Sequence, residues 1–225
     1  MSINSLESKK EQIKNQINEW YKINGRNFPW RETKNHFHIL VAEMLLRRTT
    51  AVAVSRIFHD FISHYDTPER LALSRISTIT KQVTSLGLQV LRAQHLKQTA
   101  SLIVKDFDGK VPNDFKELSN FPGVGRYVAS AVLNFAFGEP IPLVDGNVIH
   151  LMSRVFELKF DGPSDEEAWR FMDSFGPDAQ SSIFYYGIID LVATVCIRSS
   201  PRCSVCPLMQ ICSWTKKREE QDGIT

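Results

Sequence analysis

Apolar residues recur every three or four positions along most of the chain, which is the periodicity of amphipathic helices. The spacing predicts helices over residues 7–21, 36–47, 51–65, 79–86 and 93–107. Thr67 followed by Pro68 predicts the start of a further helix, with Thr67 as its N-cap. The segments 112–114 and 162–165 read as loops that lead into helices. Because no run alternates apolar and polar residues as a strand does, the pattern predicts an all-α fold.

The overall composition is that of a globular protein, with 43% hydrophobic and 23% charged residues. No apolar run is long enough to span a bilayer and no signal peptide is present, so we expect a cytoplasmic protein with reduced thiols and no membrane partner. The net charge is only +2, but residues 191–218 contain no Asp or Glu and hold five cations: Arg198, Arg202, Lys216, Lys217 and Arg218. Such a basic surface can bind phosphates, and a solvated basic tail is the alternative.

All four cysteines lie close together, as Cys196, Cys203, Cys206 and Cys212 in the spacing C-x6-C-x2-C-x5-C. Disulfides are disfavoured in the cytosol, and a bridge across so short a loop would be strained. A zinc site usually joins two C-x2-C pairs across a longer insertion. A single compact loop that supplies every thiolate suits a [4Fe–4S] cubane cluster, with zinc as the alternative.

A glycine-rich turn, Pro122-Gly123-Val124-Gly125-Arg126, precedes an apolar segment over residues 127–137 that is predicted to be a helix. Gly123 and Gly125 allow a tight turn whose backbone N–H groups can bind an anion. The N-terminus of the following helix adds a favourable dipole. Such a hairpin binds a phosphate without reading sequence, whereas an ordinary helix–helix turn is the alternative.

Two carboxylates stand out. Asp145 precedes a segment predicted to be a helix over residues 148–158, for which it is a candidate N-cap. Glu43 shares an apolar helical face with Leu40 and Leu46. Burying a carboxylate is costly unless it is paired or has a function, and burial should raise its pKa as a proton donor requires. An ion pair with a partner such as Arg92 is the alternative for Glu43.

The order and distances of these motifs are similar to those of the helix-hairpin-helix DNA glycosylase superfamily. Its endonuclease III and adenine-mismatch branches share this cysteine spacing, and the resemblance extends from Phe28-Pro29-Trp30 to Cys212. It implies two helical lobes: a six-helix barrel domain with the hairpin over residues 28–139, and an iron–sulfur cluster domain of residues 1–27 plus 140–225. DNA would bind between them, where Glu43 and Asp145 would meet, and the cysteine loop would present Arg198 and Arg202 to it.

The resemblance also assigns chemical roles. Asp145 would stabilise the positive charge that builds on the sugar as the glycosidic bond breaks. Glu43 stands where the adenine-mismatch branch has a catalytic glutamate. Tyr127 stands where strand-cutting members carry a Schiff-base lysine, and no lysine occurs between Lys116 and Lys159. We therefore expect a monofunctional glycosylase in which Tyr127 lines the base pocket, with a packing tyrosine as the alternative.

The segment Arg47-Arg48-Thr49-Thr50 resembles the thymine–guanine mismatch glycosylases, in which Arg48 would fill the hole left by the flipped base and contact the unpaired guanine. Residues 87–93 lack the aromatic pair of the adenine branch, and the chain ends without its extra recognition domain. Against this, Asp145-Gly146-Asn147-Val148 is the form typical of that branch. A surface arginine pair is the plain alternative.

Together these features predict a base-excision repair enzyme that removes thymine or uracil opposite guanine. It would act as a monomer on double-stranded DNA containing a mispair, at the nucleoid. One alternative is an adenine glycosylase that acts on A:G or A:8-oxoguanine mispairs without a C-terminal recognition domain. A non-catalytic iron–sulfur DNA-binding protein is a second alternative.

Overall fold

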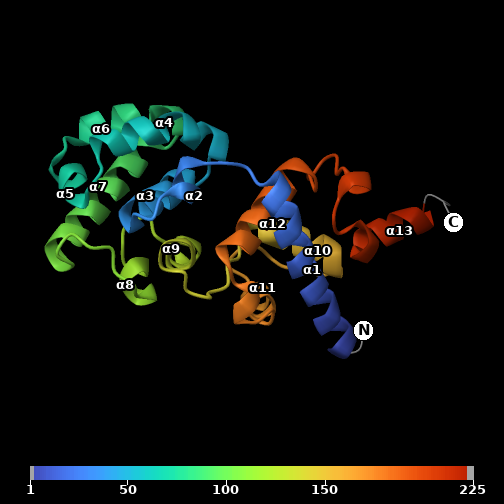
Figure 1. Cartoon of the computed structure of the whole chain (residues 1–225). Helices are drawn as coiled ribbons and strands as arrows, with labels where there is room; N and C mark the ends of the chain where they lie inside the picture. Colours follow the sequence, from blue (N-terminus) through green and yellow to red (C-terminus); the bar gives the residue numbers. More distant parts are fainter. Residues whose placement is uncertain (1–2, 222–225) are drawn as a thin grey trace. The chain divides into compact units, whose positions relative to one another are not determined.

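The computed structural model describes residues 3–221 and the side chains of residues 4–217. Arg218, the last cation of the basic segment, lies outside the described side chains. Within the described range the structure is helical and contains no strand, which confirms the all-α prediction. The helices are α1 (Ile3–Asn24), α2 (Pro29–Glu32), α3 (His36–Leu46), α4 (Ala51–His64), α5 (Pro68–Leu73), α6 (Ile76–Gln82), α7 (Gln89–Asp106), α8 (Phe115–Ser119), α9 (Arg126–Phe137), α10 (Gly146–Phe156), α11 (Glu166–Asp173), α12 (Ser182–Thr194) and α13 (Ser213–Gln221) (Figure 1).

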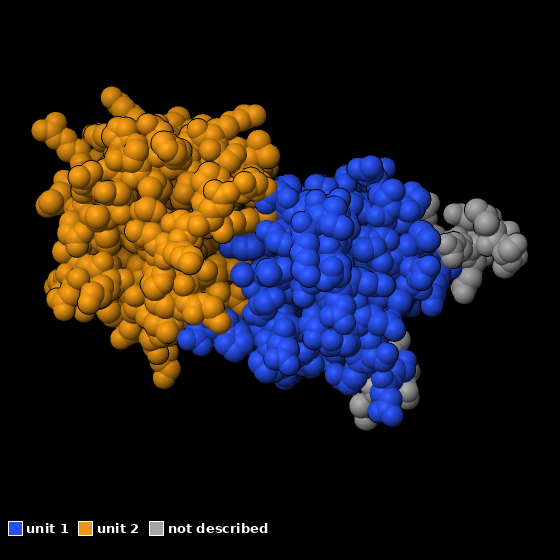
Figure 2. Space-filling model, viewed as in Figure 1, with its two compact units in different colours: residues 1–26, 139–225 blue, residues 27–138 orange. Residues whose placement is uncertain are grey.

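The chain divides into two compact units (Figure 2). Unit 2, orange in the figure, comprises Asn27–Gly138, and unit 1, blue, joins Met1–Arg26 to Glu139–Thr225. The boundaries expected from the sequence, 28–139 and 1–27 plus 140–225, lie one residue away. That the units are a six-helix barrel and a cluster domain remains a prediction.

Unit 2, Asn27–Gly138, is built around α3. Asn35 caps this helix by accepting hydrogen bonds from the backbone N–H groups of Phe37 and His38, and its side chains from Ile39 to Leu45 are all buried. Helix α9 packs against α3, and α7 packs against α5 and α6. Trp30 stacks on Phe28 at 4.8 Å between ring centroids and meets the edge of Phe58. The aromatic–proline segment at the start of this unit therefore contributes to its core.

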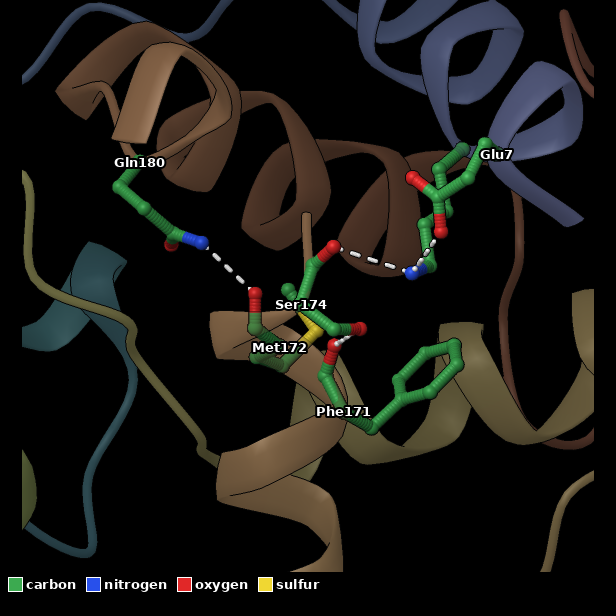
Figure 3. A network of polar contacts seen from close by, with 6 residues as sticks. Glu7, Phe171, Met172, Ser174 and Gln180 are labelled. Atoms are coloured by element: carbon green, nitrogen blue, oxygen red, sulfur yellow. Dashed lines mark hydrogen bonds and ion pairs between the residues drawn. The ribbon is translucent and has the colours of Figure 1, made fainter. Parts of the chain in front are cut away.

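Unit 1 is built on the crossing of α1 and α12. At this crossing Gly187 allows a close approach, because a Cβ added there would lie 2.5 Å from Ile17 Cγ2. Figure 3 shows how α1 is tied to the end of α11. The buried Lys10 Nζ donates to Glu7 Oε1 at 2.8 Å and to the Ser174 carbonyl at 3.0 Å. Gln180 in turn donates to the Met172 carbonyl at 2.7 Å, which fixes the loop that leads into α12.

Four predicted helices have wrong boundaries. Helix α1 covers Ile3–Asn24 rather than 7–21, and the other three differ for local reasons. Helix α10 covers Gly146–Phe156 rather than 148–158, because Asp145 caps it and Glu157 ends it in the left-handed conformation. Helix α7 begins at Gln89 rather than 93. The apolar spacing did not predict this first turn, because its side chains are largely exposed and form no buried apolar stripe. The segment 79–86 is two pieces, α6 (Ile76–Gln82) and a short 3-10 helix (Thr84–Leu86).

Candidate active site and DNA interface

Asp145 is held in a fixed orientation at the start of α10. Its Oδ1 accepts hydrogen bonds of 2.8 Å from the backbone N–H groups of Asn147 and Val148. Its Oδ2 accepts a third, also 2.8 Å, from the Asn147 side chain. The expectation that this residue caps a helix is confirmed. A cap of this kind does not compete with a catalytic role, because it fixes the carboxylate in one position.

Burial raises the pKa of Asp145, and the hydrogen bonds from Val148 and Asn147 together with the positive charge of Arg198 lower it only in part. Arg198 approaches from the cysteine loop and donates to the Gly146 carbonyl at 2.8 Å. The sequence suggested Arg198 only as a DNA contact. Its place beside the Asp145 cap could not be inferred, since the two segments lie 52 residues apart.

Glu43 lies on α3 with 4% of its surface exposed, so the predicted burial is confirmed. The alternative of an ion pair with Arg92 is wrong. All five N–H donors of the Arg92 guanidinium are directed to backbone carbonyls at the end of α3 and just before α7, so none is left for a carboxylate. The acceptors are the carbonyl oxygens of Met44, Leu45, Arg47, Leu86 and Gly87, at 2.8 to 3.5 Å.

A pocket opens on the surface of unit 2 between the end of α3 and the start of α7. It is lined by Met44, Arg47, Arg48, Leu88, Leu91, Arg92 and His95. Arg48 and Leu88 both have left-handed backbones, with φ of 51° and 50°, which is uncommon for residues other than glycine. Leu88 is 53% exposed. The structure thus places the predicted pair Arg47 and Arg48 in one pocket and adds an exposed leucine that the sequence analysis had not singled out.

The predicted glycine hairpin forms between α8 and α9. Gly123 has φ of 81°, and α9 begins at Arg126 behind Gly125. The N-cap residue Gly125 has no side chain to cap α9, and the positive end of the helix dipole favours an anion there. Helix α7 holds the hairpin in place, because the Thr99 hydroxyl donates to the Pro122 carbonyl at 3.2 Å.

Tyr127 is half-buried in the first turn of α9. Gly123 also makes the closest approach of the hairpin to its surroundings. A Cβ added there would lie 2.5 Å from His95 Nδ1 and 2.9 Å from Arg47 Nη1. The hairpin, the end of α3 and α7 are therefore packed as one assembly within this unit.

Replacing Gly123 with alanine is expected to weaken DNA binding by about tenfold or more, because the backbone is left-handed and the methyl group would displace His95 and Arg47. Fluorescence anisotropy with a labelled duplex measures the affinity. Gly138→Ala is the matched control, since Gly138 ends α9 with φ of 72° and open space around it. The control should lose comparable folding stability and keep its affinity. Equal affinity in both variants would remove the hairpin from the interface.

The four cysteines line one pocket in unit 1, enclosed by Leu151, Val155, Leu208 and Trp214 among others. None forms a disulfide. Arg154 Nη1 donates to Cys196 Sγ at 3.5 Å, and His150 Nε2 lies 2.9 Å from the Cys196 carbonyl oxygen and 3.7 Å from its Sγ. Burial raises the pKa of Cys206 to about 11 and raises that of Cys196 as well. In the described part of the chain, no three His, Cys, Asp or Glu side chains are close enough to hold a single metal ion.

Other predicted contacts are placed with less detail. Arg202 is exposed in the cysteine loop. Lys217 forms an ion pair with Glu157, so this cation of the basic segment has a partner within the protein. No helix in the described range is long and apolar enough to cross a membrane.

Comparison with known protein families identifies the fold. The model of the HhH-GPD superfamily of base excision DNA repair proteins matches residues 41–176, which include Glu43, the hairpin and Asp145. The chain belongs to this superfamily. It is a DNA glycosylase of base excision repair, and the superfamily suggested by the sequence motifs is confirmed.

Several relatives span almost the whole chain. The thymine/uracil-DNA glycosylase of Pyrobaculum aerophilum is 38% identical over 90% of this chain and 91% of its own length. The thymine-DNA glycosylase of Aeropyrum pernix is 36% identical, with 90% and 93% covered. The solved structure of a thermostable thymine-DNA glycosylase superposes with a TM-score of 0.87 at 31% identity, covering 93% of this chain and 98% of that one.

Related branches also match. A structure of a non-covalent endonuclease III–DNA complex has a TM-score of 0.80 at 27% identity, with 94% of this chain and 98% of that one covered. The adenine DNA glycosylase of Buchnera aphidicola subsp. Schizaphis graminum is 30% identical over 90% of this chain, but only 59% of its own length is covered. DNA binding follows from this kinship, whereas the base that is removed needs further argument.

Proposed function

We propose that the protein is a monofunctional glycosylase that removes thymine or uracil from mispairs with guanine. The observation that carries this proposal is the kinship just described. The Pyrobaculum and Aeropyrum relatives, which are 38% and 36% identical and match over more than 90% of their own length, are named for thymine and uracil. The placement of Arg47 and Arg48 in one surface pocket supports it, since arginine complements the O6 and N7 acceptors of guanine.

Base removal would begin with extrusion of the mismatched nucleotide, because its glycosidic bond cannot be reached inside the duplex. The carboxylate of Asp145 would then face the sugar and stabilise the positive charge that develops there. Its three hydrogen bonds keep it oriented, which favours this role. The buried Glu43 would hydrogen-bond the extruded base, and Tyr127 would line the pocket that receives it.

The DNA interface would combine phosphate binding with insertion into the base stack. The hairpin of Gly123 and Gly125 and the N-terminus of α9 would bind a backbone phosphate, with Arg126 in the first turn of that helix. Arg48 would occupy the space of the extruded base, with Arg47 beside it. The exposed Leu88 would wedge into the stack, as apolar side chains do at kinked base steps. Arg202 would contact DNA from the cysteine loop, and the protein would act there as a monomer at the nucleoid.

The four cysteines would hold a [4Fe–4S] cluster. The residues present fit this group, because all four thiols line one pocket and the Arg154 guanidinium donates to the sulfur of Cys196. When bound, the cluster would cross-link the loop of residues 196–212 to itself. The chain holds that loop in place independently, through the Arg154 guanidinium and its stacking on Trp214 at 4.5 Å.

A panel of mispaired duplexes tests the substrate. We expect T:G and U:G duplexes to be cut at the mismatched pyrimidine after alkali treatment, while A:G and A:8-oxoguanine duplexes remain intact. Cleavage confined to the adenine strand would establish the adenine alternative, which the Asp145-Gly146-Asn147-Val148 segment favours. Strand scission without alkali, or a covalent adduct trapped by borohydride, would show lyase activity and contradict the monofunctional assignment.

A further inference from the structure

His95 has no role in the chemistry proposed above, yet in unit 2 it contacts the hairpin and also lines the pocket that contains Arg47 and Arg48. It lies on α7, one turn before Thr99, whose hydroxyl holds the hairpin. Its Nδ1 lies over Gly123, where only a glycine leaves room for the ring. It also lines the pocket that contains Arg47 and Arg48. One side chain therefore borders both surfaces that are proposed to contact DNA.

The ring nitrogens of His95 form no hydrogen bond with the described part of the protein. The ring is half-buried rather than enclosed, so a ligand in the pocket can reach it. A histidine that is packed against the backbone but unpartnered at its nitrogens is available to bind an external group.

The surroundings of His95 are positively charged. Arg47 and Arg48 face it from the end of α3, and Arg92 precedes it by one turn on α7. On the hairpin side Gly123 carries no charge, and the nearest charged residue along the chain is the exposed Arg126. The residues that line the pocket include no Asp or Glu. Burial lowers the pKa of His95, and the positive charge of Arg47 lowers it further. In the free protein the ring is therefore neutral at neutral pH.

We propose that His95 is a further DNA-binding residue, which binds a backbone phosphate in its protonated form together with Arg47, so that DNA binding takes up a proton from solvent. A phosphate in this pocket would offset the positive charge of Arg47 and supply an acceptor for the ring N–H, and both effects favour the protonated ring. The inference rests on the proposed function as a DNA-binding glycosylase.

The sign of the pH dependence follows from the two protonation states. In the free protein the pKa of His95 lies under the ordinary value of histidine, and a phosphate bound beside the ring would raise it. Between these two values the complex holds more protons than the free protein. Affinity therefore increases as pH falls through that window, by up to about tenfold per pH unit for one linked proton.

The test measures binding of the intact enzyme to a T:G duplex whose thymidine carries a 2′-fluorine, which slows cleavage by destabilising the positively charged sugar. Calorimetry in two buffers of different ionisation enthalpy gives the number of protons taken up, and anisotropy gives Kd between pH 5.5 and 8.5. We expect His95→Asn and His95→Gln to lose the uptake and to flatten the pH dependence. His59→Gln, at an exposed position on α4, should behave as wild type.

Failure of the role of His95 and failure of the proposed function give different results. If the His95 variants retain the same proton uptake and pH dependence as wild type, the role of His95 is wrong even though the enzyme binds and cleaves DNA. If the variants bind weakly at every pH with the wild-type slope, His95 is only a packing residue and the proposal fails. If wild type neither binds the duplex nor removes a base, the proposed function itself fails.

Discussion

Replacing Asp145 with asparagine is expected to reduce the rate of base removal by about 10²–10³-fold while leaving DNA binding intact. Asparagine also caps helices well, so the backbone N–H groups of Asn147 and Val148 keep an acceptor. The variant removes only the negative charge that stabilises the sugar in the transition state. Single-turnover cleavage of a T:G duplex measures the rate, and anisotropy measures binding. An active Asp145→Asn variant would overturn the catalytic assignment, and an inactive wild type would favour the non-catalytic alternative.

The same substitution lowers activity but is expected to maintain or raise the folding stability at neutral pH. Because burial raises the pKa of Asp145 in the folded state, the unfolded carboxyl group loses its proton first as pH rises. Folding stability therefore falls as pH rises from the unfolded to the folded pKa value, and the loss is complete above the folded pKa. The variant should be as stable as wild type or more stable at neutral pH, with any advantage disappearing at acid pH. The rate of wild type should decline with acid at a pH above the ordinary aspartate range.

Asp165 provides the matched control. It is also an N-cap, of α11, but its carboxylate is only partly buried, and hydrogen bonds from the backbone N–H groups of Asp161 and Glu167 lower its pKa. Its ionised form stabilises the fold above the unfolded pKa, and that stability is lost as pH falls through the folded pKa. Asp165→Asn should therefore lose a little stability at neutral pH and keep full activity. Thermal unfolding across pH distinguishes the two aspartates, and the same pH trend in both would contradict the cause given for Asp145.

Replacing Cys206 with serine is expected to cost about 4 kcal/mol or more of folding stability, because it removes one ligand of the proposed cluster and leaves a buried site incomplete. Iron and sulfide content should fall together with the visible absorbance of the purified protein, and base removal should fall with the population of folded protein. Chemical denaturation monitored by circular dichroism measures the loss of stability.

Ser204→Ala is the control for this experiment, since Ser204 is exposed between two of the cysteines and offers no thiolate. It should retain metal, absorbance and stability. Purified wild-type protein that contains zinc and no iron would show that the cluster assignment is wrong. A stable, fully active Cys206→Ser variant would show that the loop does not depend on a metal site at this position.

Most helices, two helix caps, the cysteine site and the burial of Glu43 could be predicted from the sequence alone, because the signals for them are local. Helical periodicity placed most helices, and cap residues such as Thr67 and Asp145 marked helix starts because a cap bonds N–H groups two or three residues away. The cysteines were recognisable as one site because all lie between residues 196 and 212. The apolar neighbours of Glu43 along one helix were enough to predict its burial.

Other features were decided only by the tertiary structure. Arg92, a candidate partner of Glu43, instead donates to carbonyl groups up to 48 residues away. Arg198 lies against the Asp145 cap, and His95 lies over Gly123. No local pattern encodes these contacts, since each joins segments that meet only when helices pack. The sequence therefore determined which groups could take part in the chemistry, and long-range packing decided which of them lie together.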